Sequence, residues 1–81
     1  MTEKQIRDRL VREVADAAQI STERVDSREP FATYGLGSLE AVYLVGQLEE
    51  WLGVPLDATL LWDHPTIDAL AKHLTRVVTP T

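Results

Sequence analysis

Ser38 is the side chain best placed for covalent chemistry, because it ends a glycine-containing loop and opens a long amphipathic segment. The nucleophile elbow of a serine hydrolase has glycines two residues before and two residues after its serine. Here those positions hold Leu36 and Glu40. Asp63 and His64 are the nearest candidates to complete a triad, but adjacent residues do not align as orienting acid and general base. A small hydrolase is therefore the least supported hypothesis, and no catalytic residue is assigned.

The residue types and their spacing also disfavour a metal site and a nucleotide-binding site. His64 and His73 are nine residues apart and do not share a helical face, and the chain has no cysteine. We expect His64 to be a turn residue before Pro65, and His73 to lie near a helix C-terminus where a partial positive charge is favourable. No phosphate-binding loop of the G-x-x-x-x-G-K-[ST] type is present. The sequence predicts no metal site.

Two roles remain open for Ser38. A serine at the start of a helix often serves as the N-cap, where its hydroxyl accepts a hydrogen bond from a backbone N–H. If Gly37 is the N-cap instead, Ser38 is the first helical residue and its hydroxyl is free. The N–H groups and dipole of a helix N-terminus also favour an attached phosphate.

Length and charge restrict the classes of function. The 81 residues form one small domain, 1–81, in which a deep enclosed active site is not expected. The net charge is −5, and residues 29–71 hold seven acidic side chains and no Lys or Arg. This pattern argues against nucleic acid and anionic membranes, and it suits a partner with a basic patch, although an acidic surface can also serve solubility alone. No signal peptide or membrane span is present, so we expect a cytoplasmic location.

The elements that position these residues are helical, and the predicted fold class is an all-α, four-helix bundle of three long helices and one short one. Thr2 and Gln5 predict a capping box, Asp57 a cap for the short helix, and Thr66 an N-cap for the last helix. Residues 79–81 are expected to fray. The predicted elements are helix 3–18, loop 19–37, helix 38–52, short helix about 57–62 and helix about 66–78.

Apolar periodicity predicts which side of each helix is buried. The expected core positions are Ile6, Leu10, Val14 and Ala17 in the first helix, Ala41, Leu44, Val45, Leu48, Trp51 and Leu52 in the second, and Ile67, Leu70, Ala71, Leu74, Val77 and Val78 in the last. Isolated apolar residues are expected to pin the long loop to the core: Ile20, Val25, Phe31, Tyr34 and Leu36.

The second helix has a second apolar face, which one small core does not require. It is formed by Leu39, Val42, Tyr43 and Gly46, and Glu40, Gln47 and Glu49 separate it from the core face. We therefore expect a helical domain that presents a serine beside a spare apolar helix face.

Two segments resemble the signatures of acyl and peptidyl carrier proteins. They are Pro30-Phe31 with Tyr34-Gly35-Leu36-Gly37-Ser38-Leu39-Glu40-Ala41-Val42, and Trp62-Asp63-His64-Pro65-Thr66-Ile67. The resemblance covers residues 3–78. It implies a four-helix carrier domain that catalyses nothing. A phosphopantetheinyl transferase would move 4′-phosphopantetheine from coenzyme A onto Ser38, and the thiol of that arm would hold an acyl group as a thioester.

The resemblance also assigns neighbouring residues. Gly37 and Leu39 flank the attachment site, and the family's usual aspartate before the serine is Gly37 here. We expect the missing carboxylate to affect how generic phosphopantetheinyl transferases recognise the chain. The partner-binding face implied by the resemblance and by the spare apolar arc is Leu39, Glu40, Val42, Tyr43, Gly46, Gln47 and Glu50.

We expect an acyl carrier protein of polyketide, hybrid lipopeptide or fatty-acyl secondary-metabolite biosynthesis. The alternatives are a peptidyl carrier of a nonribosomal peptide pathway and a non-carrying module that binds a partner helix or groove. Gly35-Leu36-Gly37-Ser38-Leu39 is more similar to the acyl type. Because no Pro- or Gly-rich linker is apparent, we expect a free-standing monomer. We expect an acyl-activating ligase, rather than an acyltransferase, to charge the carrier in trans. Downstream synthase domains would then use the charged carrier.

Overall fold

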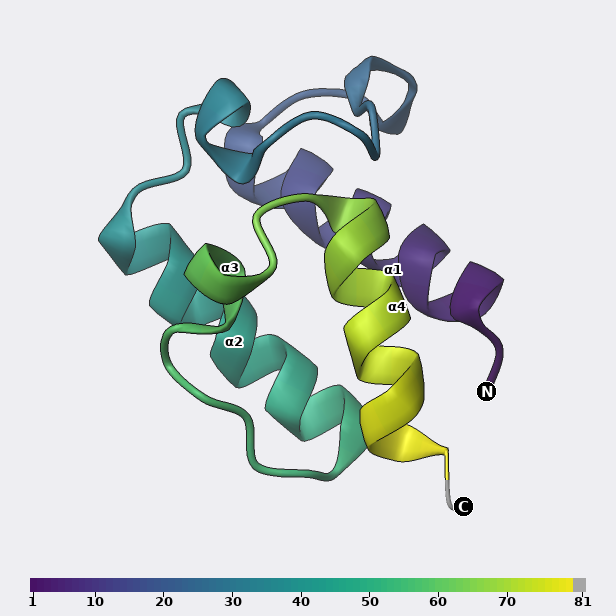
Figure 1. Ribbon diagram of the computed structural model, residues 1–81. Helices are drawn as coiled ribbons and strands as arrows, with labels where there is room; N and C mark the ends of the chain where they lie inside the picture. Colours follow the sequence, from purple (N-terminus) through teal and green to yellow (C-terminus); the bar gives the residue numbers. More distant parts are fainter. Residues whose placement is uncertain (80–81) are drawn as a thin grey trace.

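The structure is a computed structural model that describes residues 1–79, and its described part is all-α, as predicted. Figure 1 shows the arrangement of the helices. Two 3₁₀ turns, η1 and η2, lie in the connection between α1 and α2. No described helix is long and apolar enough to cross a membrane. The elements are α1 Glu3–Ala18, η1 Thr22–Arg24, η2 Phe31–Tyr34, α2 Ser38–Leu52, α3 Leu60–Asp63 and α4 Ile67–Val78.

Helix α1 begins with the predicted capping box. Gln5 N–H donates to Thr2 Oγ1 at 3.2 Å, and Thr2 N–H donates to Gln5 Oε1 at 2.8 Å. The buried strip differs at one position from the prediction: Ala15 is buried, whereas Ala17 is half-buried at the edge of the core. The strip is displaced because α1 packs against both α4 and α2. Ile6, Leu10 and Val14 are buried as predicted.

The connection between α1 and α2 contains no strand and is held by side chains, as predicted. Phe31 is buried, and Val25, Tyr34 and Leu36 pack against the core, whereas Ile20 is only half-buried and lies outside the core cluster. These anchors give a long connection a defined path over the helices.

Backbone hydrogen bonds also join this connection to the beginning of α4. Phe31 N–H donates to Pro65 O at 2.9 Å, and Asp68 N–H donates to Ser27 O at 3.0 Å. The loop that leads to Ser38 is therefore fixed to the segment between α3 and α4 (Figure 1).

Helix α3 is shorter than predicted and begins later. Asp57 Oδ1 accepts from Thr59 N–H and from Thr59 Oγ1, both at 3.0 Å, so Asp57 stabilises a turn before the helix rather than capping the helix itself. Thr59 is the N-cap, and the helix runs only from Leu60 to Asp63.

Helix α4 begins as predicted at its N-cap Thr66, whose Oγ1 accepts from Ala69 N–H at 3.1 Å. The predicted core face of α4 is wrong at Val77, which is 41% exposed. The last turn extends past the edge of the core, and only Val78 still packs against it. The expected fraying of residues 79–81 falls, for Pro80 and Thr81, outside the described residues.

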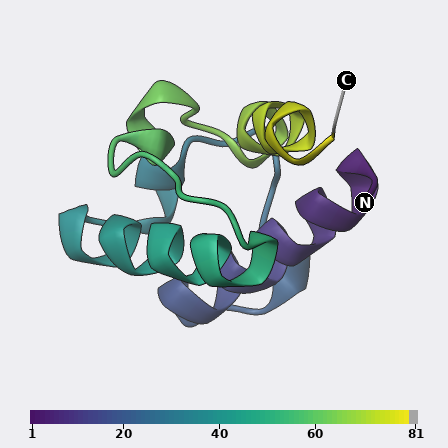
Figure 2. The same ribbon diagram turned by 90° about the horizontal axis from the view of Figure 1, so that it is seen from below.

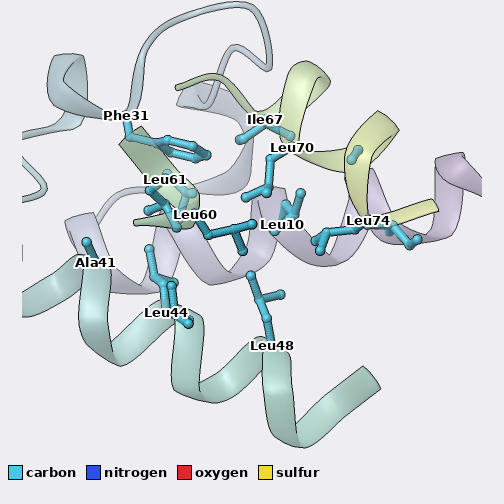
Figure 3. Close-up of a cluster of buried hydrophobic side chains, with 14 residues drawn as sticks. Leu10, Phe31, Ala41, Leu44, Leu48, Leu60, Leu61, Ile67, Leu70 and Leu74 are labelled. Atoms are coloured by element: carbon cyan, nitrogen blue, oxygen red, sulfur yellow. The ribbon is translucent and has the colours of Figure 1, made fainter. Parts of the chain in front are cut away.

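The core lies among the four helices: in Figure 2, α3 and α4 lie on one side of it, and α2 and most of α1 lie on the other. Figure 3 shows Ala41, Leu44 and Leu48 of α2 directed toward leucines of the other helices. Trp51 and Leu52 are partly buried at the edge of this cluster. No polar or charged residue of the described part is fully buried. The predicted core face of α2 is thus confirmed.

Candidate functional site

Ser38 is the first helical residue of α2, and Gly37 is the N-cap. Of the two roles left open by the sequence, the structure therefore selects the one in which the hydroxyl is not used as a cap. Ser38 is exposed at the outer end of α2. Its side chain is accessible to a large partner without movement of the core.

The chain reaches this position through a turn that requires glycine. Gly35 ends η2 with φ +72°, in the left-handed region that other residues rarely adopt. Its N–H donates to Ala32 O at 3.1 Å. The turn redirects the chain, and α2 begins three residues later.

Glu40 closes the first turn of α2. Its Oε1 accepts from Gly37 N–H at 2.7 Å, and Ala41 N–H donates to Gly37 O at 3.0 Å. This is the glutamate half of a capping box, and a carboxylate in the first helical turn is also favoured by the helix dipole. From the sequence, Glu40 was expected at the border of the two apolar faces and on the partner face. The glutamate three residues after the cap was the signal for its structural role.

The predicted apolar face of α2 is exposed. The exposed fractions are 78% for Leu39, 58% for Val42 and 61% for Tyr43, and Gly46 is also exposed. A shallow groove is lined by Leu39, Glu40, Val42 and Tyr43 of α2. Ala17 of α1, which was expected in the core, also lines it.

The glutamates near this face have different environments. Glu50 is exposed, and Gln47 is half-buried. Glu49 Oε2 accepts from Leu56 N–H at 2.9 Å, so it holds the chain that follows α2. Among the glutamates of α2, Glu50 is the one whose carboxylate makes no hydrogen bond to the described residues.

A second apolar feature lies beside the loop that leads to Ser38. A pocket of about 170 Å³ is lined by side chains of the loop, α2 and α3, including Phe31, Leu36, Ala41 and Leu61. Trp62 forms part of its rim and is 59% exposed. No sequence pattern predicted this pocket, because its walls come from separate segments of the chain.

The two histidines are neighbours, which the sequence did not indicate. The rings of His64 and His73 stack with their centroids 4.0 Å apart and their planes inclined by 16°. Burial, followed by the charges of His64 and Arg76, lowers the pKa of His73, and the carboxylate of Asp63 opposes this shift. The expectation that His73 favours a positive charge is therefore wrong. No group of three potential metal-ligating side chains occurs among the described residues.

The comparison with protein families decides the class of this site. A family model described as a phosphopantetheine attachment site matches residues 8–74, a span that includes the exposed serine at the start of α2. The chain belongs to this family. It is a carrier domain with the four-helix fold described above, and domains of this family hold 4′-phosphopantetheine covalently.

The relatives of this carrier domain include polyketide synthases. The domain is 37% identical over 71 residues to one subunit of the phenolphthiocerol/phthiocerol polyketide synthase of Mycobacterium tuberculosis, a match that covers 88% of this chain and 4% of that synthase polypeptide. The chain thus spans a very small part of that relative.

Two solved structures are similar over nearly the whole chain. One is a free-standing peptidyl carrier protein from an Acinetobacter baumannii secondary metabolic pathway, with 34% identity, a TM-score of 0.91, and coverage of 95% of this chain and 96% of that one. The other is an acyl carrier protein from Anabaena with a variant phosphopantetheinylation-site sequence, with 33% identity, a TM-score of 0.88, and coverage of 96% and 89%. Acyl and peptidyl carriers are both consistent with this fold.

Proposed function

We propose that Ser38 Oγ carries the 4′-phosphopantetheine arm and that the domain is an acyl carrier of polyketide or related secondary-metabolite assembly, itself without catalytic activity. The assignment rests on the exposed hydroxyl of Ser38 at the first position of α2. This hydroxyl is not used as a helix cap, because Gly37 is the N-cap. Because this chemistry uses coenzyme A, we place it in the cytoplasm.

Attachment of the arm is a phosphoryl transfer onto the hydroxyl. A bond forms between Ser38 Oγ and the phosphorus that bears pantetheine, the pyrophosphate bond of coenzyme A breaks, and adenosine 3′,5′-bisphosphate leaves. A base of the phosphopantetheinyl transferase takes the hydroxyl proton. The N-terminal dipole of α2 stabilises the negative phosphodiester. Gly37 and Leu39 flank the new group and leave it open to solvent.

Partner enzymes are proposed to meet the exposed face of α2. Leu39, Val42 and Tyr43 supply apolar area, and Gly46 leaves room for a side chain of the partner. Gln47 and Glu50 lie along the same helix, and the acidic central segment attracts basic patches. The proposed partners are the transferase, an acyl-activating ligase or acyltransferase that charges the thiol, and downstream synthase domains.

Intact-mass spectrometry after incubation with coenzyme A and a phosphopantetheinyl transferase tests the assignment. The wild-type chain should gain one phosphopantetheine group, and Ser38→Ala should gain none. Since Ser38 is not the cap, Ser38→Ala should remain folded, with a change of less than about 0.5 kcal/mol. Ser21→Ala, a matched control at another exposed serine, should be modified like the wild type. Modification of Ser38→Ala would reject the assignment, and an unmodified wild-type chain would favour a non-carrying interaction module.

The peptidyl alternative is supported by the similarity to the Acinetobacter peptidyl carrier. It can be separated from the acyl assignment by offering the modified protein to an acyl-activating ligase and to an amino-acid-activating enzyme. Charging by the ligase supports the acyl carrier. Charging by the amino-acid-activating enzyme alone replaces it with the peptidyl carrier.

A further inference from the structure

The groove on the exposed face of α2 is lined by two helices. Four of its residues come from α2: Leu39, Glu40, Val42 and Tyr43. The fifth is Ala17, which lies in the last turn of α1. The exposed apolar surface beside Ser38 therefore continues from α2 onto α1, whereas the proposed partner face lies on α2 alone.

The small size of Ala17 keeps the groove open on the α1 side. Its side chain is a single methyl group, which is half-buried and packs against the edge of the core. The neighbouring core is occupied by buried side chains of α1 such as Val14. Because a packed core does not accept additional atoms, a larger side chain at residue 17 would extend into the groove.

The lining of the groove suits an apolar ligand. Leu39, Val42 and Tyr43 are exposed and present mostly carbon atoms. Glu40 is the charged residue of the lining, and its Oε1 already accepts a hydrogen bond from Gly37 N–H. The groove therefore favours an aliphatic or aromatic side chain over a charged one.

The position of the groove indicates which partner enters it. Leu39 follows Ser38 directly, and the other α2 residues of the lining lie within the next turn and a half of the helix. An enzyme that modifies Ser38 Oγ must bring its active site to that oxygen, so its surface covers the start of α2. Enzymes that act on the thiol at the far end of the arm are not held to this position.

Charge favours the same partner. A transferase that uses coenzyme A must bind the phosphates of that substrate, and it does so with cationic groups near its active site. Residues 29–71 of the carrier contain seven acidic side chains and no Lys or Arg. A basic surface around the active site of the transferase is thus complementary to the segment that contains Ser38.

We propose that the groove receives an apolar side chain of the phosphopantetheinyl transferase, and that Ala17 of α1 is a specificity-determining residue for this docking. The inference rests on the proposed function of Ser38. A methyl group at residue 17 admits the side chain of the transferase, and a larger group excludes it. Residue 17 should therefore control the affinity of the carrier for the transferase without changing the phosphoryl-transfer step.

The first test fills the groove. Ala17→Leu introduces a strong helix former, so its melting temperature should stay within about 4 °C of the wild type. In transfer from coenzyme A, it should raise KM for the carrier about tenfold and leave kcat within about twofold. Ala18→Leu makes the same change at the next residue, which is also half-buried but does not line the groove, and should behave as wild type.

A second test measures docking without chemistry. The Ser38→Ala protein accepts no phosphopantetheine, so it should inhibit modification of the wild type competitively. Adding Ala17→Leu to this inhibitor should raise its inhibition constant about tenfold. Leu39→Ala should weaken inhibition less in the presence of Ala17→Leu than in its absence, because the transferase side chain that contacts both residues no longer enters the groove.

Charged substitutions at the same residue test the chemistry of the partner, and they remain informative if Ala17→Leu impairs folding. The side chains of Ala17→Lys and Ala17→Glu can both place their charged ends in solvent. A basic transferase surface should bind the Lys variant at least about threefold more weakly than the Glu variant at low salt. The difference should shrink as the salt concentration rises. Equal binding of the two variants, or weaker binding of the Glu variant, would overturn the assignment of the partner.

The remaining outcomes separate this inference from the proposed function. An unchanged KM and inhibition constant with Ala17→Leu, or an equal effect of Ala18→Leu, would overturn the role of Ala17 and leave Ser38 as the attachment site. Normal modification of Ala17→Leu with impaired charging of its thiol would place a different enzyme in the groove. A dimer in sedimentation experiments that Ala17→Leu dissociates would place a second copy of the chain there, and either result would overturn the inference. A wild-type chain that accepts no phosphopantetheine would overturn the proposed function as well.

Discussion

Two leucines of α2 offer a matched test of which side of the helix faces a partner. Leu48 is 1% exposed and lies in the core, whereas Leu39 is 78% exposed beside Ser38. The same substitution to alanine at each position removes the same atoms from two environments. We expect Leu48→Ala to affect folding and Leu39→Ala to affect transfer to partners.

The expected magnitudes follow from burial. Truncation of a fully buried leucine costs about 2–5 kcal/mol, which in a domain of this size lowers the melting temperature by about 10–40 °C. Leu39→Ala should change stability by less than about 0.5 kcal/mol, because alanine favours the helix and little apolar area is lost. If Leu39 is a central contact, the loss of about 1–2 kcal/mol of binding should reduce kcat/KM for transfer to a partner about 5- to 30-fold.

Circular dichroism melts and single-turnover transfer from the modified carrier to a partner enzyme provide the two measurements. Transfer by Leu48→Ala is measured at a temperature where it remains folded. The assignment of faces is refuted if the melting temperature of Leu39→Ala falls as far as that of Leu48→Ala. The docking role of Leu39 is refuted if transfer by Leu39→Ala matches the wild type.

Three further substitutions test other parts of the structure. Tyr34→Phe removes hydrogen bonds to Asp26 N–H at 2.6 Å and Asp26 O at 2.9 Å, so it should cost about 1–2 kcal/mol in urea unfolding; an unchanged midpoint would contradict this. Gly53→Ala, at φ +70°, should cost about 1 kcal/mol and Gly53→Asn less, which thermal melts can compare. The pKa of His73 is lowered from 6.5, so the folded state disfavours its protonation, and the stability that neutral His73 contributes should be lost as pH falls below about 6.5. His73→Gln should flatten this decline in melting temperature, and an identical pH slope would reject the role of His73.

The helices were predictable because their signals are local. Apolar periodicity and caps such as Thr2 and Thr66 act within one or two turns of the chain, and they located α1, α2 and α4 closely. Helix α3 was predicted to begin too early. An aspartate such as Asp57 can stabilise a turn as readily as it can cap a helix, and the local sequence does not distinguish these two roles.

The site was predictable only in part. Its serine and spare apolar face lie within one helix, so the pattern of α2 revealed both. The stacking of His64 on His73 and the pocket beside Trp62 depend on segments brought together by folding. The link between Gly37 and Glu40 is local, and the spacing of a glutamate three residues after the cap could have predicted it.

The packing of the first helix against the last has a consequence for how the domain is made and how it breaks. Because α1 packs chiefly on α4, the apolar strip of α1 has no complete cover until the ribosome has released the final helix. Folding therefore follows synthesis of the whole domain, and α1 is a segment that chaperones can bind during translation. Tension applied to both ends of the domain bears directly on the α1–α4 contact, so under mechanical load these two helices separate first.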